Sequence, residues 1–343
     1  MTTTIVATIF VFGLLIFFHE VGHFFTAKLV GMQVDEFAIG FGPKLLSWKS
    51  RETLYSLRII PLGGYNKIAG MDPDEEQNEH SFNRKPIWSR ILVIVAGSAM
   101  NFILPVLLFF LVFISAGIDT PSNQPLVGSV ITGKPAAQAG MLAGDRILAI
   151  DGEDVASWRQ FVGIVQQSTG KSLAIDVERA GQQYKFMVVP EFDAGGNRGI
   201  VGITPQITNY RPGIIKSAGL AVKQTYLVGM GMLAGLMQMI TGQVAAEVAG
   251  PIGVAQMAGE IAQLGFVPLV QFAAFLSINL GLINLFPIPV LDGGHVVALA
   301  VEGLRGRPLN RDKMQFIQMV GFMLLMLLLI VATFKDITKL NLF

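Results

Sequence analysis

The pattern His-Glu-Val-Gly-His at residues 19–23 is the part of this sequence best suited to metal chemistry. On a helix, positions i and i+4 share a face, so the imidazoles of His19 and His23 would converge on one ion. The carboxylate of Glu20 could then accept a proton from a water that zinc has acidified. The pattern predicts His19 and His23 as zinc ligands and Glu20 as the catalytic base. The alternative is a polar patch where a helix meets lipid headgroups.

A third protein ligand is expected, because a catalytic zinc uses three and keeps its fourth position open. Asp292 follows Pro287 and Pro289 in a late apolar segment, where an unpaired carboxylate is costly unless a cation accompanies it. We expect Asp292 to be this ligand, and it could at the same time cap the helix that restarts after the prolines. His295, three residues further on, is the rival ligand.

Apolar segments long enough to cross about 30 Å of hydrocarbon must position these residues. A further apolar segment, Ser217–Thr241, is expected to lie in the membrane interface, because a crossing there would separate Asp292 from the histidines by the depth of the bilayer. Four spans remain, and they cover Thr4–Ala27, Trp88–Ile118, Val267–Gly303 (broken by prolines) and Met314–Phe334.

Composition agrees with a membrane protein that also has polar modules. Of 343 residues, 52% are hydrophobic and only 14% are charged, which is too apolar for an ordinary soluble protein. The net charge of +1 gives no reason to expect binding to nucleic acid. The chain has no cysteine, which excludes disulfides, thiolate metal ligands and a cysteine nucleophile.

Two polar segments separate the spans. Residues 30–70 contain strand-like runs at Val34–Phe41 and Thr53–Pro61, which predict a membrane-associated β-hairpin or small sheet. Residues 125–205 contain short strand-like runs around a probable helix at Ser157–Gln167, and the run Lys134–Gly152 resembles that of a PDZ domain. The fold class expected is therefore a polytopic α-helical membrane protein of about four spans, with a membrane-associated β segment and one inserted PDZ domain of α+β/β-barrel type.

This reading divides the chain into three parts and gives it an orientation. Residues 1–118 and 209–343 form the two halves of a membrane core, and residues 119–208 form the PDZ domain. Residues 28–90 hold nine Lys and Arg, so this connection is expected to face the cytoplasm. Both termini and the PDZ domain would then be extracytoplasmic, with the metal site near the cytoplasmic side.

These motifs together resemble those of the site-2 protease family of intramembrane zinc metalloproteases, and most of all the bacterial regulator-of-sigma-E protease branch. The likeness covers nearly the whole chain, although only one PDZ domain is found where some members have two. It rests on five segments, which are HEVGH at 19–23, Gly-Phe-Gly-Pro at 40–43, Pro-Leu-Gly-Gly-Tyr at 61–65, Gly-x-x-x-Asn at 97–101 and Asn-x-x-Pro-x-Pro-x-Leu-Asp-Gly at 284–293.

The resemblance implies an enzyme that uses Zn²⁺ in a bacterial cytoplasmic (inner) membrane and cuts single-span membrane proteins, such as anti-sigma factors or remnant signal peptides. It implies His19, His23 and Asp292 as metal ligands and Glu20 as the general base. The substrate-binding residues expected are Asn284, Pro287, Gly40, Gly42, Gly63 and Gly64. For Gly97 and Asn101, plain helix packing is the favoured role.

Three other functions stay open at this point. A membrane-anchored zincin with its site in water would need a soluble domain that carries the third ligand. A non-catalytic PDZ membrane scaffold would explain the spans and the PDZ domain but not the histidines. A metal transporter would place polar residues along several spans, whereas here they lie in two.

Overall fold

A computed structural model describes residues 1–71, 78–193, 198–244, 249–307 and 310–339 of the chain. These residues form two compact units, one made of Met1–Ala116 with Gly213–Phe343 and the other of Gly117–Pro212. The domain limits read from the sequence, at 118/119 and 208/209, stay a prediction.

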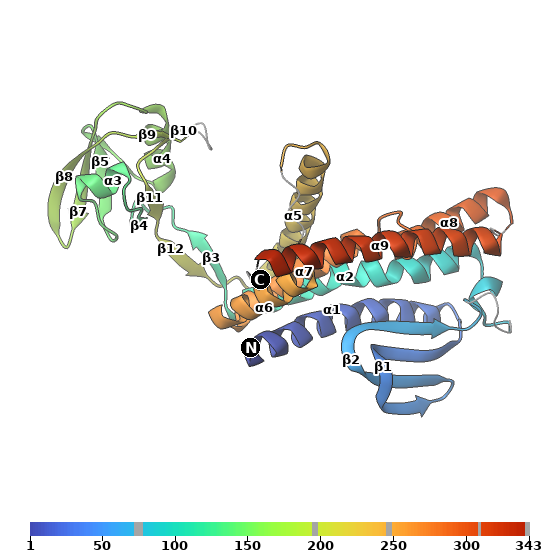
Figure 1. The fold of residues 1–343 in the computed structure, drawn as a ribbon. Coiled ribbons are helices and arrows are strands. Elements are labelled where there is room, and N and C mark those ends of the chain that lie inside the picture. The colour runs from blue at the N-terminus through green and yellow to red at the C-terminus, as the bar shows by residue number, and fades with distance from the viewer. Residues whose placement is uncertain (72–77, 194–197, 245–248, 308–309, 340–343) are drawn as a thin grey trace. The chain divides into compact units, whose positions relative to one another are not determined.

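The first unit is mainly helical (Figure 1). Five of the described helices are long and apolar enough to cross a membrane, namely α1, α2, α5, α7 and most of α9, and α5 is the least apolar of them. The α-helices of this unit are α1 (Thr2–Leu29), α2 (Ile87–Ser115), α5 (Ile214–Ile240), α6 (Pro251–Leu264), α7 (Phe266–Asn284), α8 (Asp292–Arg305) and α9 (Arg311–Lys339), and a 3₁₀ turn, η1 (Phe82–Arg84), precedes α2.

The late segment expected as one broken span is two helices. Residues 285–291 separate α7 from α8, and Pro287 and Pro289 lie in this connection, because proline has no N–H to continue a helix. The expected break is therefore confirmed. A count of four spans, with α5 in the interface, stays a prediction.

Helix α6 was not expected from the sequence. It begins with Pro251 at its first turn and packs against α1, α7 and α9. The carboxylate of Asp336 in α9 accepts hydrogen bonds from the backbone N–H groups of Gly250 (3.0 Å) and Gly253 (2.8 Å). Asp336 thus supplies the acceptor that the first turn of α6 lacks, and it is buried there.

Two long strands, β1 (Val34–Ser50) and β2 (Thr53–Ile68), form the sheet between α1 and α2 along the chain. The expected strand ends at residues 41 and 61 are wrong, because the chain bends at these places and continues as strand. The bends coincide with Gly40, Gly42 and Gly63, whose positive φ angles are costly for other residues. Each long strand therefore contributes two paired stretches.

The register brings four stretches side by side. Phe37 pairs with Tyr55 on one side and with Asn66 on the other. The pairings of the described strands leave residues 64–68 with a partner on one side only, and we call these residues the edge segment. The sheet packs on α1 through aromatic rings, with the centroids of Phe24 and Phe37 5.2 Å apart.

The outer part of the sheet presents apolar side chains. Leu45, Leu46 and Trp48 are each about 60% exposed. Such an exposed apolar patch is typical of a protein or membrane contact, and this agrees with the membrane association expected for residues 30–70.

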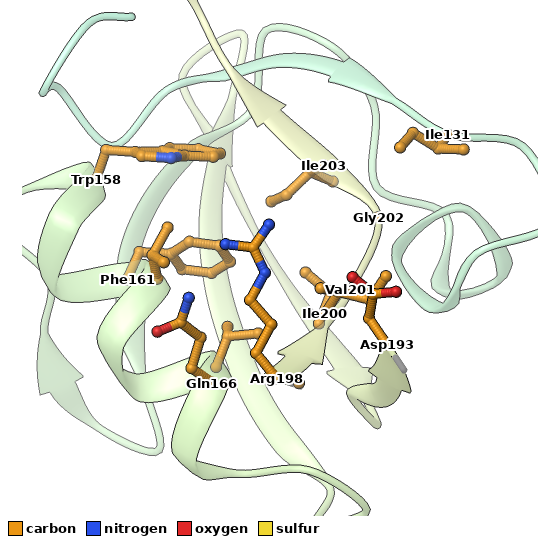
Figure 2. A pocket seen from close by; sticks show the side chains of 13 residues that line it. Ile131, Trp158, Phe161, Gln166, Asp193, Arg198, Ile200, Val201, Gly202 and Ile203 are labelled. Atoms are coloured by element: carbon orange, nitrogen blue, oxygen red, sulfur yellow. The ribbon is translucent and has the colours of Figure 1, made fainter. Parts of the chain in front are cut away.

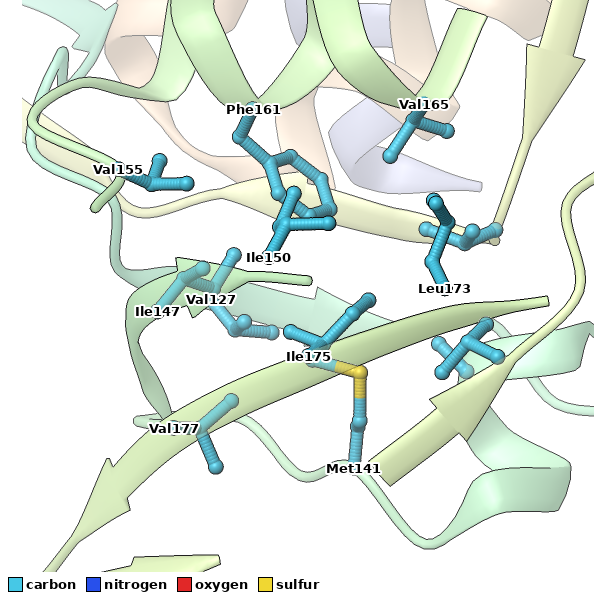
Figure 3. Packing of buried hydrophobic residues seen from close by; sticks show 13 residues of the cluster. Val127, Met141, Ile147, Ile150, Val155, Phe161, Val165, Leu173, Ile175 and Val177 are labelled. Carbon is cyan, nitrogen blue, oxygen red and sulfur yellow. The ribbon is translucent and has the colours of Figure 1, made fainter. Parts of the chain in front are cut away.

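The second unit has its own apolar core. The core lies between α4, whose Ser157 cap accepts a hydrogen bond from the N–H of Gln160, and the four-stranded sheet β6-β5-β7-β8 (Figure 3). The expected helix at 157–167 is confirmed. The elements of this unit are β3 (Ile118–Pro121), β4 (Val127–Val130), α3 (Pro135–Ala139), β5 (Arg146–Ile150), β6 (Glu153–Asp154), α4 (Trp158–Gln167), β7 (Leu173–Arg179), β8 (Gln182–Val188), β9 (Glu191–Asp193), β10 (Arg198–Ile200), β11 (Ile203–Pro205) and β12 (Ile207–Tyr210).

Candidate metal centre

The side chains of His19, His23 and Asp292 meet at one point of the first unit. The two Nε2 atoms lie 3.2 Å apart. Asp292 Oδ2 lies 3.6 Å from His19 Nε2, and Asp292 Oδ1 lies 3.6 Å from His23 Nε2. Two histidines from one turn of α1 and a carboxylate 269 positions later than His23 (292 − 23) are thus in contact.

These separations fit a zinc ion. Zinc bonds of about 2.0–2.1 Å in tetrahedral geometry place ligand atoms about 3.3 Å apart. The 3.2 Å between the two Nε2 atoms, and the 3.6 Å from each Nε2 to one of the two Asp292 oxygens, lie within a few tenths of an ångström of that value. Among the described residues, the group of potential metal ligands comprises these three side chains and does not include His295.

The partners of the outer imidazole nitrogens favour the same role. His23 Nδ1–H donates to the carbonyl oxygen of Val93, 2.8 Å away, which leaves Nε2 with a free lone pair. His19 Nδ1 lies 3.1 Å from the Asn101 side-chain amide, whose Oδ1 is buried and has no hydrogen-bond partner in the described part of the chain. A half-turn of that amide would let Oδ1 accept from His19 Nδ1–H, as a metal-binding His19 requires.

Helix α2 approaches the histidines closely at Gly97. A Cβ atom at this position would lie 2.2 Å from His23 Nε2 and 2.8 Å from His19 Cε1. The absence of a side chain at Gly97 is what admits both imidazole rings. Gly97 and Asn101 therefore contact the candidate ligands, in addition to the helix packing that the sequence favoured for them.

Asp292 is held from two directions. It is the first residue of α8, and Leu291 rather than Asp292 occupies the cap position. A carboxylate in the first turn of a helix is stabilised by the helix dipole. Ser98 Oγ on α2 donates a hydrogen bond of 3.0 Å to Asp292 Oδ2, which fixes the orientation of the carboxylate.

Glu20 is buried beside the histidines, on α1. Asn66 of the edge segment donates from Nδ2 to Glu20 Oε2 at 2.7 Å and to the Glu20 carbonyl oxygen at 2.8 Å. Gly64 lies against the same side chain, since a Cβ there would be 2.8 Å from Glu20 Cγ. The edge segment therefore runs directly past the candidate base.

The other residues predicted to bind substrate occupy different places. Gly64 adjoins Glu20, whereas Gly40, Gly42 and Gly63 lie at the bends of the sheet. Asn284 is the last residue of α7 and is half-buried, and Pro287 is exposed in the connection that leads to Asp292. Their roles in binding stay predictions.

Three contacts of this centre are not predicted by any local sequence pattern. Asn66, Ser98 and the Val93 carbonyl all belong to segments that are distant in sequence from the residues they touch.

The second unit contains a cavity of about 360 Å³ between α4 and the segment 199–203. Trp158, Phe161 and Val165 line it from the helix, and Ile203 lines it from β11 (Figure 2). The side chain of Arg198 also lines the cavity. The cavity is mostly apolar, and Gln166, Asp193 and Arg198 add an amide, an anion and a cation to its lining.

Comparison with known proteins gave matches to nearly the whole chain and, among solved structures, to about a quarter of it. Residues 7–328 match Peptidase family M50. The regulator of sigma-W protease RasP of Bacillus subtilis is 33% identical, over 98% of this chain and 99% of that protein. A putative zinc metalloprotease of Clostridium acetobutylicum is 38% identical, over 97% of each chain. Among solved structures, the PDZ domain of an SdrC-like protein from Listeria monocytogenes is 26% identical, with a TM-score of 0.22, and the match covers 26% of this chain and 93% of that domain.

Proposed function

The chain belongs to peptidase family M50, the family of the site-2 proteases, and from this premise we propose that it is an intramembrane protease that hydrolyses peptide bonds within or near the transmembrane segments of single-span membrane proteins. Family membership confirms the resemblance seen in the sequence motifs and makes the chain a zinc metalloprotease. The substrate class, the residue roles and the membrane orientation are parts of the proposal.

The observation that carries the proposal is the meeting of His19, His23 and Asp292 next to a buried Glu20. We assign the three side chains as zinc ligands, because their spacing and the hydrogen bonds behind the imidazoles suit that ion. When bound, zinc supplies a Lewis acid that polarises a carbonyl group and acidifies water. Ser98 and Asn101 would hold the ligands in place from α2.

Glu20 is assigned the proton transfers of the reaction. Its carboxylate would take a proton from the attacking water and return it to the leaving amine, so that water adds across the peptide bond. Asn284, at the end of α7, would bind the backbone of the substrate near the cut.

A transmembrane helix must unwind before hydrolysis, because its internal hydrogen bonds shield every carbonyl. Among the described strands, the edge segment pairs on one side, with β1, and it passes beside Glu20. We propose that an unwound substrate pairs with residues 64–68 as an added strand, which would replace its lost helical bonds and present one carbonyl to the metal centre.

The second unit would act as a docking module of PDZ type. Its cavity offers apolar walls from α4, which suit the apolar last residue of a peptide C-terminus, and its lining carries both Arg198 and Asp193. Such an end could be left by an earlier cut of the substrate. With the orientation expected from the basic residues, this module is extracytoplasmic and the metal centre lies near the cytoplasmic side, in a bacterial cytoplasmic membrane.

A direct test compares wild type with Glu20→Gln and with Glu260→Gln, in which an exposed glutamate of α6 is changed. Each protein is purified in detergent, its zinc content is measured, and a panel of single-span substrates with and without PDZ-accessible C-termini is assayed. The proposal expects about one zinc per chain in all three proteins and cleavage by wild type and Glu260→Gln only. Cleavage by Glu20→Gln at the wild-type rate would remove Glu20 from the mechanism and refute the proposal. Purified protein free of zinc would also refute it, and would favour the PDZ scaffold.

A further inference from the structure

Asn66 links the edge segment to the candidate base by two hydrogen bonds. An amide nitrogen carries two protons, and both are directed to Glu20, one to Oε2 (2.7 Å) and one to the backbone oxygen (2.8 Å). In the described part of the chain, the hydrogen bonds to the Glu20 carboxylate reach Oε2 only and come from Asn66. The other carboxylate oxygen, Oε1, is thus left for water.

The orientation of this amide is determined by its partners. Both groups that it meets on Glu20 are acceptors, so a half-turn would bring Oδ1 against two oxygens and lose both bonds. Asn66 Oδ1 is buried and has no hydrogen-bond partner among the described residues. Among the described residues, the Asn66 side chain therefore donates hydrogen bonds to Glu20 and makes none to its own sheet, β1–β2.

We propose that Asn66 is a positioning residue, which holds the Glu20 carboxylate in place and couples it to the strand that receives the substrate. This inference rests on the proposed function, because it assigns Glu20 the proton transfers. Without Asn66, the carboxylate would be free to rotate about its side-chain bonds, and fewer bound substrates would meet a correctly aligned base. Since the hydrogen bonds of Asn66 among the described residues go to Glu20 and not to His19, His23 or Asp292, we expect zinc binding not to depend on it.

The test measures kcat, KM and zinc content for Asn66→Ala and for Asn66→Asp, which keeps the size of the side chain but replaces the donor with an acceptor. The probe is the single-span substrate that wild type cleaves fastest in the panel above. We expect kcat to fall about 10- to 100-fold in Asn66→Ala and at least as far in Asn66→Asp, with KM within about twofold and zinc unchanged.

The matched control is Thr53→Val in the same strand. Thr53 is buried and donates a hydrogen bond of 2.7 Å to the Val34 carbonyl, so its replacement disturbs β2 without touching Glu20. We expect its kcat to equal that of wild type. If Asn66→Ala does not fold, the same-sized Asn66→Asp decides.

Three results would overturn the inference. They are kcat within about twofold of wild type in both Asn66 variants, a rise in KM with kcat unchanged, and a loss of zinc in proportion to the loss of activity. Full activity of Glu20→Gln in the same assay would instead refute the proposed function, so the two failures can be told apart.

Discussion

Replacement of Gly97 by alanine should abolish the metal centre through one methyl group. The new Cβ would lie 2.2 Å from His23 Nε2 and 2.5 Å from His23 Cε1. Carbon and nitrogen atoms in contact normally stay about 3.5 Å apart, so the ring or helix α2 would have to move by about 1.3 Å. Ligand positions in a metal site tolerate about 0.2 Å. The required movement is roughly six times that tolerance.

Helix α2 cannot relieve the clash cheaply. Gly22 of α1 packs so closely on α2 that a Cβ there would lie 2.3 Å from the Ala96 carbonyl oxygen, and a retreat of α2 would open this contact. Rearrangements of a well-packed core of this kind cost about 1–3 kcal/mol. We therefore expect Gly97→Ala to fold but to retain less than about a tenth of a zinc per chain, with activity lowered at least about 100-fold.

The assay is elemental analysis of zinc in the purified protein, followed by substrate cleavage. Gly13→Ala is the matched control, because Gly13 also lies in a membrane helix and a Cβ there would meet nothing within 4 Å. We expect this control to keep its zinc. A Gly97→Ala protein with one zinc per chain and the wild-type rate would show that α2 does not press on the histidines, and the reasoning would fail.

Three further outcomes are expected. Ser98→Ala removes the donor to Asp292, so zinc affinity measured by competition with a chelator should fall about 10- to 100-fold, and an unchanged affinity would argue against ligation by Asp292. Burial alone would raise the pKa of Glu36, but hydrogen bonds from its neighbours in the sheet outweigh it and hold the pKa at about 2. Because the folded-state pKa lies below the unfolded value, Glu36 stabilises the fold above about pH 4.5 and loses this effect as the pH falls towards 2. Thermal unfolding of Glu36→Gln should therefore lack the loss of stability that Glu36 causes between these pH values. Arg179→Met leaves the fully buried carboxylate of Asp145 without its ion pair, and should lower the free energy of unfolding of the second unit by about 3–5 kcal/mol in a denaturant titration.

The residues to which we assign chemical roles were predictable where helical spacing or a costly burial pointed to them. His19, Glu20 and His23 follow from helical spacing, and Asp292 follows from a carboxylate in a broken apolar segment. Asn66 could not be found in this way, because a polar residue in a strand next to glycines has many possible partners. Its contact with Glu20 depends on the register of the sheet, which a sequence does not state.

The limits of the sheet were missed for a related reason. Glycine and proline normally end strands, and the run around Gly40 to Pro43 was read as such an end. In the folded chain, glycines at positive φ turn each strand through a bend without ending it, so one strand contributes to two pairings. Helix α6 was missed because it is short and is held by a residue of α9 that lies far along the chain.

That distant residue gives the folding of the membrane unit an order in time. Asp336 is made 83 residues after Gly253, whose N–H it accepts, so the head of α6 has no such acceptor while the intervening chain is still being synthesised and inserted. Until α9 is in place, the backbone N–H groups of Gly250 and Gly253 can donate only to water or lipid headgroups. A substitution such as Asp336→Leu would then act late in biogenesis. Each helix would still insert, but α9 would fail to pack against α6, which is already in place.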